Sequence, residues 1–220
     1  MVYKGVKAMR AGRIRMTVLI LTAVFAAVCL TGCSKRFKSS DVIDTAKGYG
    51  MRSIDREEFE KRWQAGFFSK EYFERFIKSK AYFVSKDSSE ADEIYARYFQ
   101  FDTADYPGLE EFIECEDPDT YFDMVMMTAR KEESAKRLYD EWADYWKEDD
   151  DAASYSGKKN GYDYLVSYYP ALDGYRCIGM YLKGNTFIMI YTYASDGNDC
   201  ACLDHFCKKL KLVKPEPSKK

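Results

Sequence analysis

The sequence is poor in the residues and motifs that most enzyme sites need. Its single histidine, His205, would have to serve any Ser/His or Cys/His nucleophile scheme. No Gly-rich phosphate loop, HExxH zinc motif or GxSxG nucleophile elbow occurs. A Cys-x-x-Cys redox pair is also missing, and Cys200-x-Cys202 is a weak substitute for it. We therefore assign no catalytic residue, metal or cofactor, and we favour a protein that is not an enzyme.

An apolar run long enough to span a membrane as a helix is also absent. The apolar run near the start, residues 17–30, has 14 residues, whereas a spanning helix needs about 20. Five Lys and Arg and no Asp or Glu precede it. This order of a basic stretch and a short apolar run is typical of an export signal that is later removed. We predict that residues 1–32 are such a signal.

The predicted signal ends in Leu30-Thr31-Gly32-Cys33. This segment resembles the lipobox of bacterial lipoproteins, in which an aliphatic residue and two small residues precede a cysteine. The resemblance implies that Cys33 receives diacylglycerol and becomes the first residue of a protein anchored in the cell membrane, facing outside the cytoplasm. Two acyl chains together anchor a protein stably. The alternative is an ordinary secretory signal, with Cys33 present by chance.

Without residues 1–33 the chain is acidic. It has 29 Lys and Arg against 36 Asp and Glu, a net charge of −7. An acidic protein gains nothing from the counterion release that drives nucleic-acid binding, so we expect no nucleic-acid partner. A short basic tail, residues 214–220, could contact anionic lipid or a wall polymer, although a solvated tail is the simpler interpretation.

The first part of the exported chain predicts a tether followed by helices. Residues 33–52 are polar and basic without an apolar period, which predicts a lipidated cysteine and a flexible tether. Asp55 and Glu58 form a capping-box pair that predicts a helix ending at Gly66. The next predicted elements are a short helix from Ser69 and strands at 80–85 and 94–101.

The second part predicts a sheet with helices. The predicted elements are a buried strand at 122–128, a helix at 132–147, a polar loop at 148–161, strands at 162–169, 175–183 and 186–193, and a helix at 199–212. Gly184-Asn185 is a strong hairpin signal between the last two strands. We predict a single α+β domain over residues 53–213, with a mostly antiparallel sheet and helices packed on one face.

The pattern from residue 122 onward resembles a group of small lipoproteins of Gram-positive bacteria. It shares with them a hydrophobic strand that leads into a helix like Glu132-Glu133-Ser134-Ala135-Lys136, then a closing sheet and a terminal helix. The resemblance covers about 90 residues. It implies a fold and a location, and no residue role.

Cysteines gather near the end of the chain. Cys200, Cys202, His205 and Cys207 have the ligand types of a tetrahedral zinc site. On the predicted helix, Cys200 and Cys207 share one side while Cys202 and His205 point away, so a metal site requires this segment to be a loop. Disulfides can form outside the cytoplasm. Cys200 and Cys207 are therefore either core residues or disulfide-bonded. The disulfide candidates are Cys177, Cys200 and Cys207, and Cys177 could meet one of the cysteines of the terminal helix.

Acidic residues are plentiful but lack a ligand pattern. Glu114, Asp117 and Asp119 form one stretch, and residues 148–151 form another. Neither has the glycine and the alternating ligands of a calcium loop. We interpret both as solvated loops.

Tyrosine is the one compositional excess, with 19 residues. Alternation along the late strands puts rings on both faces of the sheet, and one face must meet the helices. If the other face is open, it is an aromatic platform for a sugar ring, a peptide or a protein. Tyrosines that merely suit half-buried strands are the alternative. The candidate binding residues are Tyr164, Tyr168, Tyr175, Tyr181, Tyr191 and Tyr193.

These features favour a membrane-anchored extracytoplasmic lipoprotein that is a non-enzymatic binding or adaptor module. Its partner would be a protein, a peptide or a cell-wall polymer on the Tyr-rich sheet face. One alternative is a transport-associated solute-binding lipoprotein, which should have two lobes around a cleft. The other is an envelope enzyme with paired carboxylates, whose signature would be two carboxyl groups about 5 to 9.5 Å apart in a cleft.

Overall fold

The fold is that of a computed structural model, which describes residues 36–66, 69–98, 108–147, 152–171, 173–195 and 200–217. The predicted signal and Cys33 lie outside these residues. All the described residues belong to one compact unit, Arg36–Lys220. None of the described helices has both the length and the apolar character needed to cross a membrane.

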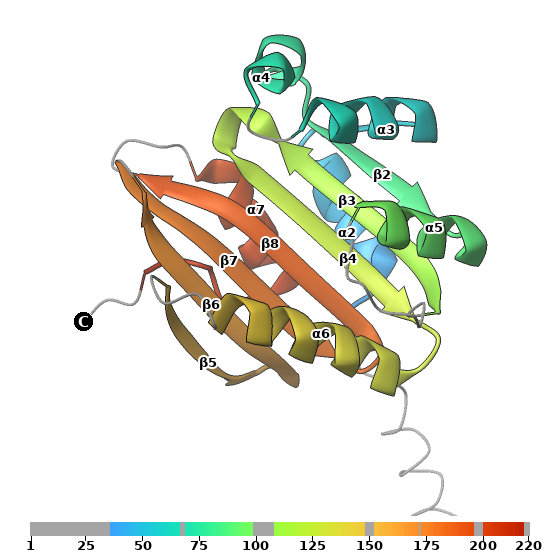
Figure 1. Ribbon diagram of the computed structural model, residues 1–220, viewed down its shortest axis with the longest axis vertical. Coiled ribbons are helices and arrows are strands. Elements are labelled where there is room, and N and C mark those ends of the chain that lie inside the picture. Colours follow the sequence, from blue (N-terminus) through green and yellow to red (C-terminus); the bar gives the residue numbers. More distant parts are fainter. Residues whose placement is uncertain are drawn as a thin grey trace, which may run out of the picture. The chain divides into compact units, whose positions relative to one another are not determined.

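Eight strands form one sheet, in the order β1-β2-β3-β4-β8-β7-β6-β5 (Figure 1). Neighbouring strands are antiparallel except β1 and β2, which are parallel. The strands are β1 Arg52–Ser53, β2 Ala81–Ser85, β3 Leu109–Asp117, β4 Phe122–Ala129, β5 Ala153–Lys159, β6 Tyr162–Ala171, β7 Gly174–Lys183 and β8 Thr186–Ser195. The prediction of an α+β domain with a mostly antiparallel sheet is confirmed.

Helices complete the described unit. They are α2 Ser39–Gly48, α3 Arg56–Ala65, α4 Lys70–Phe76, α5 Ser88–Tyr98, α6 Glu132–Lys147 and α7 Ala201–Leu210, with one 3-10 turn, η1 Pro118–Thr120. In Figure 1, α5 and α6 lie in front of the sheet, and α2 and α7 lie behind it.

The helices cover both faces of the sheet, so the prediction that they pack on one face is wrong. One core cluster contains Phe59 of α3, Ile94 of α5 and Leu138 of α6. A second, separate cluster contains Val42 of α2 and Phe206 of α7. The reason lies in β4, where seven of eight consecutive residues are buried. Successive strand residues point to opposite faces, so a strand buried throughout needs cover on both.

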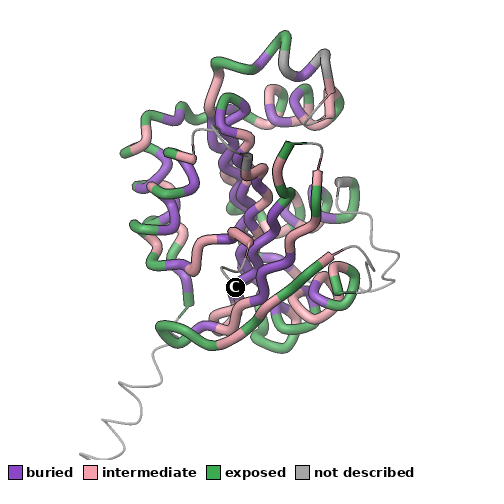
Figure 2. The backbone as a smooth tube through the Cα atoms, turned by 90° about the vertical axis from the view of Figure 1, so that its left-hand side faces the viewer, coloured by how far each residue is buried: buried purple, intermediate pink, exposed green. Residues whose placement is uncertain are grey.

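The predicted flexible tether over residues 33–52 is wrong for its described part. Ser39–Gly48 is the helix α2, and Val42, Thr45 and Ala46 on it are buried. These residues recur at three and four positions, a helical stripe too short to stand out in a polar segment. Figure 2 shows that buried and exposed residues alternate along the helices, as expected for helices that pack one side against the sheet. The folded unit therefore begins only a few residues after Cys33.

Two other predicted elements are wrong. The strand predicted at 94–101 is replaced by α5 in its described part, residues 94–98. The Asp87 carboxylate caps this helix by accepting hydrogen bonds from the N–H groups of Ser89 and Glu90 at 2.9 and 3.0 Å. The loop predicted at 148–161 contains β5, which pairs with β6 along its whole length.

The other predicted helices and strands agree with the structure. The Asp55 carboxylate accepts a hydrogen bond from Glu58 N at 2.9 Å and starts α3, and Ser69 Oγ accepts one from Tyr72 N at 3.0 Å at the start of α4. The helix α6 spans the predicted residues. Gly184, with φ of 57°, makes the turn between β7 and β8.

Candidate functional site

The six predicted tyrosines do not share one face of the sheet. Tyr164 lies opposite Tyr181 in the ladder, and Tyr168 lies opposite Cys177. By alternation Tyr164, Tyr168, Tyr175 and Tyr181 therefore face α7. Tyr191 and Tyr193 lie opposite Ile178 and Arg176, and so point to the other face.

Three of the six tyrosines already use their hydroxyls in contacts within the fold. Tyr181 is fully buried, and its hydroxyl donates to Val213 O at 2.6 Å. The Tyr191 hydroxyl is hydrogen-bonded to that of Tyr169 at 3.3 Å, and Tyr193 donates to Asp173. These contacts agree with the alternative in which tyrosines suit half-buried strands.

The remaining three join a fourth ring, Tyr155 of β5. Ring centroids lie 6.4 Å apart for Tyr155 and Tyr164, 6.5 Å for Tyr155 and Tyr168, and 6.0 Å for Tyr168 and Tyr175. We call these four residues the tyrosine row. Tyr175 is 41% exposed, and the other three are half-buried. Tyr155 was missed in the sequence because its strand was interpreted as a loop.

A segment of the chain's own C-terminal part lies beside this row. The hydroxyls of Tyr155, Tyr162 and Tyr181 donate to the main-chain carbonyls of Glu216, Lys211 and Val213, at 3.1, 3.2 and 2.6 Å. The Val213 N–H in turn donates to the Tyr162 hydroxyl at 2.8 Å. We call residues 211–217, which follow α7 without helical structure, the C-terminal segment.

The expected solvated tail is therefore wrong where the structure describes it. Pro215 is buried, and Lys214 pairs with Asp204 at 2.7 Å. A sheet face that presents tyrosine hydroxyls to a non-helical segment can bind a polypeptide main chain without regard to its side chains.

The acidic stretch predicted to be a solvated loop is the buried strand β3. Glu114, Glu116 and Asp117 are 5%, 4% and 3% exposed, so that interpretation is wrong. Glu114 and Glu116 point to the same face, and Asp123 of β4 lies directly opposite Glu116. The structure thus brings three carboxyl groups together between two central strands.

These carboxyl groups line a cavity of about 270 Å³, which we call the acidic pocket. Its lining residues are Arg62, Trp63, Gly66, Tyr72, Glu114, Glu116 and Asp123. Both oxygens of Glu116 are used: Oε1 accepts from Arg62, and Oε2 accepts from the Tyr72 hydroxyl at 2.5 Å. Arg62 also donates to Glu58 at 3.0 Å and to Ser79 at 2.7 Å.

Burial changes the acidity of this pocket. It raises the pKa of Glu114 well above its ordinary value, with the charges of Asp123 and Glu116 adding to the effect. Burial and the neighbouring Glu116 raise the pKa of Asp123 to about 8. Burial also raises the pKa of Glu116, while the Arg62 guanidinium acts against the change. Among the described residues, Asp123 Oδ1 is buried without a hydrogen-bond partner.

Two sequence signals could have pointed to this pocket. Asp123 is the one acid inside the predicted buried strand at 122–128. Arg62 lies three residues after Phe59, on the apolar side of its helix. A charge on an apolar stripe needs a buried partner, but nothing local identifies Glu116, which is 54 positions away.

The terminal cysteines form no metal site in the part of the chain that the structure describes, where no group of three or more metal-binding side chains is found. Cys202 is buried with Cys207 in the second core cluster, so the prediction that it points away from the core is wrong. Burial raises the pKa of Cys177 to about 12, and the nearby Cys200 adds to it. A disulfide from Cys177 stays a prediction.

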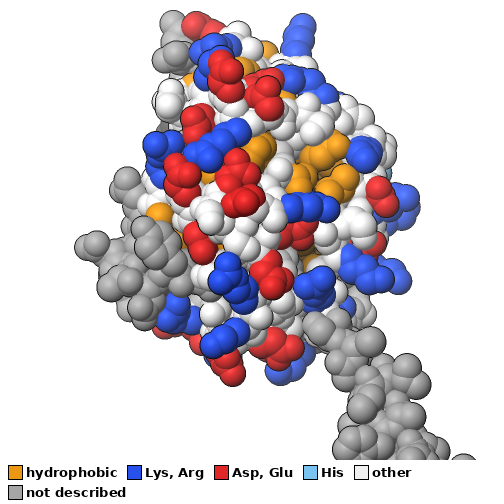
Figure 3. All heavy atoms as spheres, turned by 90° about the vertical axis from the view of Figure 1, so that its right-hand side faces the viewer, with side chains coloured by type: hydrophobic (Ala, Val, Ile, Leu, Met, Phe, Trp, Pro, Cys, Tyr) orange, Lys and Arg blue, Asp and Glu red, His pale blue; other side chains and the backbone are white. Residues whose placement is uncertain are grey.

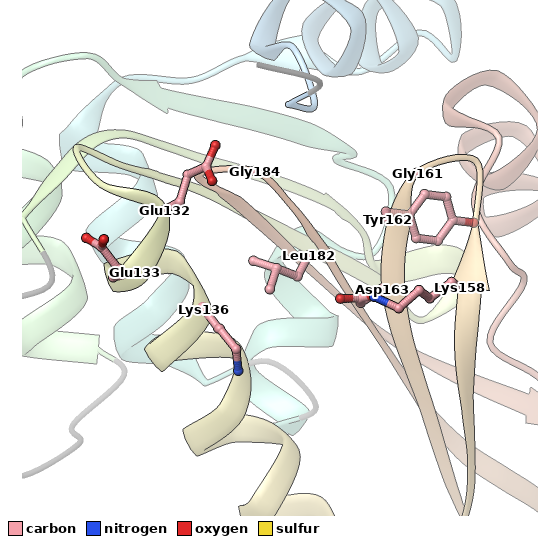
Figure 4. A pocket seen from close by; sticks show the side chains of 9 residues that line it. All are labelled: Glu132, Glu133, Lys136, Lys158, Gly161, Tyr162, Asp163, Leu182 and Gly184. Atoms are coloured by element: carbon pink, nitrogen blue, oxygen red, sulfur yellow. The ribbon is translucent and has the colours of Figure 1, made fainter. Parts of the chain in front are cut away.

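A groove of about 480 Å³ lies between the start of α6 and the turns that join β5 to β6 and β7 to β8. Its charged side chains do not converge (Figure 4): Glu132 and Glu133 lie on the helix side, and Lys158 pairs with Asp163 across from them at 2.8 Å. We assign no ligand to this groove.

The surface over α3 and α5 mixes charges of both signs (Figure 3). Arg56 pairs with Glu60 and Glu93 at 3.0 and 2.8 Å, and Arg97 pairs with Glu60 at 3.2 Å. Because positive and negative side chains alternate and pair here, this face has no electrostatic potential of a single sign.

Comparison with family models and with curated proteins finds no match for the chain. Among solved structures, the extracellular domain of PknH from Mycobacterium tuberculosis is similar, with 11% sequence identity and a TM-score of 0.31, over 61% of this chain and 80% of that chain. A TM-score of this size does not establish a shared fold, so this similarity carries no argument about function.

Proposed function

We propose that the chain is a membrane-anchored, extracytoplasmic binding module whose tyrosine row holds a non-helical segment of a protein partner. One observation carries the proposal: the hydroxyl of Tyr155 in the row, and those of Tyr162 and Tyr181 next to the row, already donate to main-chain carbonyls of the C-terminal segment. This contact is to the backbone, so it suits polypeptides of varied sequence.

The row extends past the C-terminal segment. Within the described residues, the hydroxyls of Tyr164, Tyr168 and Tyr175 have no hydrogen-bond partner. Tyr175 is also one of the exposed large hydrophobic side chains. Rigid rings with a free polar tip are the residues that contribute most to many interfaces. We propose that a partner segment binds along these three rings.

The proposed location rests on the sequence. A basic stretch, a short apolar run and Leu30-Thr31-Gly32-Cys33 follow one another in the order of a lipoprotein signal. Lipidation of Cys33 would hold the binding module at the outer surface of the membrane.

The binding proposal can be tested with a random 12-residue peptide display library panned against the exported form, residues 34–220. We expect enriched peptides to bind the parent chain and to bind a Tyr168→Ser/Tyr175→Ser variant at least about tenfold more weakly, because loss of a central interface tyrosine costs about 2 kcal/mol. Tyr145→Ser is the matched control, since Tyr145 is 56% exposed on α6, outside the row. Equal binding by the double variant, or no enriched peptide, would overturn the proposal.

A second candidate function is binding of a small cationic solute in the acidic pocket. The observation that favours it is Asp123 Oδ1, a buried acceptor without a partner among the described residues, on a cavity lined by three carboxyl groups and one guanidinium. The volume of about 270 Å³ is just below the usual range of ligand sites. It suits a small ammonium group better than a saccharide, which counts against the glycosidase type of paired-carboxylate enzyme.

Native mass spectrometry of the exported form purified from its host tests this candidate. We expect a reproducible added mass that Asp123→Asn removes and Asp140→Asn keeps, since Asp140 lies on the surface in an ion pair with Lys136. If the parent chain has only the mass of its sequence, with no added mass, the solute-binding candidate is contradicted and the tyrosine row remains as the proposed site.

A further inference from the structure

Five cations gather where the first folded residues meet the end of α7. They line a hollow of about 220 Å³ together with Phe37, Asn160 and Tyr162. We call them the basic patch: Arg36, Lys38, Lys183, Lys209 and Lys211. Asp41 is the one acidic residue among the described lining residues. The patch joins three distant parts of the chain, so the fold and not the local sequence creates it.

The cations of the basic patch form no salt bridge with the described residues. The cations of α3 differ from them, because Arg56, Lys61 and Arg62 all pair with carboxylates. In an exported chain with a net charge of −7, a cluster of unpaired positive charge is a distinct feature that favours an anionic partner.

The frame of the patch is packed. Phe37 is 8% exposed, and its ring lies 5.7 Å from that of Tyr162. Lys183 Nζ lies 5.5 Å from the centroid of Phe37. The carbonyl of Lys211 accepts from Asn160 Nδ2 at 3.1 Å. The main chain that presents these cations is therefore held by the core.

The patch is also close to the proposed anchor along the chain. Arg36 is three positions after Cys33, so a fully extended chain allows at most about 11 Å between them. That distance is close to the screening length of roughly 8 Å at physiological ionic strength. If Cys33 is lipidated, as the proposed function requires, Arg36 and Lys38 lie within electrostatic reach of the lipid headgroups.

We propose that the basic patch binds the phosphate groups of anionic phospholipids beside the anchor and holds the domain against the membrane. Each Lys or Arg near an anionic surface strengthens binding about fivefold. The rest of the exported chain is acidic, so the same membrane repels it. The domain therefore docks with the basic patch toward the membrane.

This orientation leaves the tyrosine row accessible. Tyr175 and Lys183 lie eight residues apart on β7, which places them roughly 27 Å apart along the strand. When the Lys183 end of the strand is at the membrane, the Tyr175 end points away from it. A partner segment can then reach the row from outside.

Vesicle flotation of the exported form, residues 34–220, tests the inference. Both core clusters lie within these residues, so this form keeps its fold, and it lacks Cys33, so its binding does not depend on lipidation. We expect it to float with phosphatidylcholine vesicles that contain about 30 mol% phosphatidylglycerol, an anionic lipid, and not with pure phosphatidylcholine vesicles. High salt should release it.

Variants separate the patch from general charge effects. Lys183→Gln/Lys209→Gln should weaken flotation by about tenfold or more, whereas Lys86→Gln, at a lysine 69% exposed on another part of the surface, should leave it unchanged. Equal flotation with both vesicle types, or equal loss in the control, would overturn the inference. So would binding to poly(glycerol phosphate) without binding to vesicles, which would assign the patch to a phosphate polymer. Failure of Cys33 lipidation would be seen separately in the membrane fraction of cells.

Discussion

Arg62 shows how a buried charge is tolerated in this fold. It is 1% exposed, and its guanidinium donates to Glu116, Glu58 and Ser79 and lies 4.6 Å from the Phe76 ring centroid. Each polar edge of the group is satisfied, which a buried ion pair requires if it is not to destabilise the protein. The carboxyl groups next to it depend on this one cation.

Arg62→Ala should therefore be strongly destabilising. Removing one partner of a buried pair leaves an uncompensated charge, here Glu116, and costs about 3 to 5 kcal/mol. Arg56→Ala is the matched control on the same helix, because Arg56 makes three ion pairs but is 36% exposed, and exposed pairs contribute under about 1 kcal/mol each. Urea unfolding measures both. Equal losses would show that the Arg62 network does not stabilise the core.

Asp123 makes the free energy of unfolding depend on pH, with a sign that the direction of its pKa shift determines. Burial, with Glu116 adding to it, raises the pKa of Asp123 from 3.8 to about 8, so between these values the folded state holds a proton that the unfolded chain has lost. The free energy of unfolding should fall as pH rises through this window, by up to about 1.4 kcal/mol per pH unit. The raised pKa of Glu114 acts in the same direction. Unfolding in urea at pH 5, 6, 7 and 8 measures the slope.

Asp123→Asn should reduce that slope, because the amide does not titrate. Asp140→Asn removes a carboxylate that is 49% exposed, and it should leave the slope as in the parent chain. An unchanged slope in Asp123→Asn would mean that this group titrates in the folded protein as it does in the unfolded chain.

At the scale of elements, the sequence correctly predicted the helix ends and turns that are determined by contacts between residues close together in the chain. The caps at Asp55 and Ser69, the stripe of α6 and the turn at Gly184 are all set within a few residues, and all are confirmed. The strand β3 was missed because its glutamates suggest solvent, and their burial depends on Arg62 and Tyr72 from elsewhere in the chain. Long-range electrostatics of this kind leave no local signature.

The helix α5 was mistaken for a strand because Ile94 and Tyr95 also suit strands. Its true signals are the Asp87 cap and the buried Ala91, Ile94 and Tyr95 at helical spacing. Asp87→Ala should cost about 1 kcal/mol in the free energy of unfolding, since it removes the acceptor of two N–H groups. Asp87→Ser should retain most of the stability, because serine also caps. If the alanine variant is as stable as the parent, the cap does not hold this helix.

At the scale of the whole molecule, the missing information was which face each element covers. The sequence predicts the strands of the late sheet, but it cannot show that α2 packs beside α7, where His205 meets Thr45 from 160 positions away. This contact closes the second core. For the same reason the basic patch could not be predicted, because its residues come from three distant parts of the chain. Alternation predicts tyrosines on both faces of the sheet, but which rings stay exposed depends on which helices and segments cover each face.

The proposed anchor makes a prediction for the whole chain in its host. Cys33→Ala should abolish incorporation of labelled palmitate and shift the protein out of the membrane fraction, because two acyl chains supply the stable anchorage. Cys200→Ala is the control, a half-buried cysteine of the folded unit, and it should keep both label and location. Any membrane association that remains in Cys33→Ala should be lost at high salt, since the basic patch alone would hold the protein and salt screens it. Label or salt-resistant binding in Cys33→Ala would instead place the anchor elsewhere in the chain.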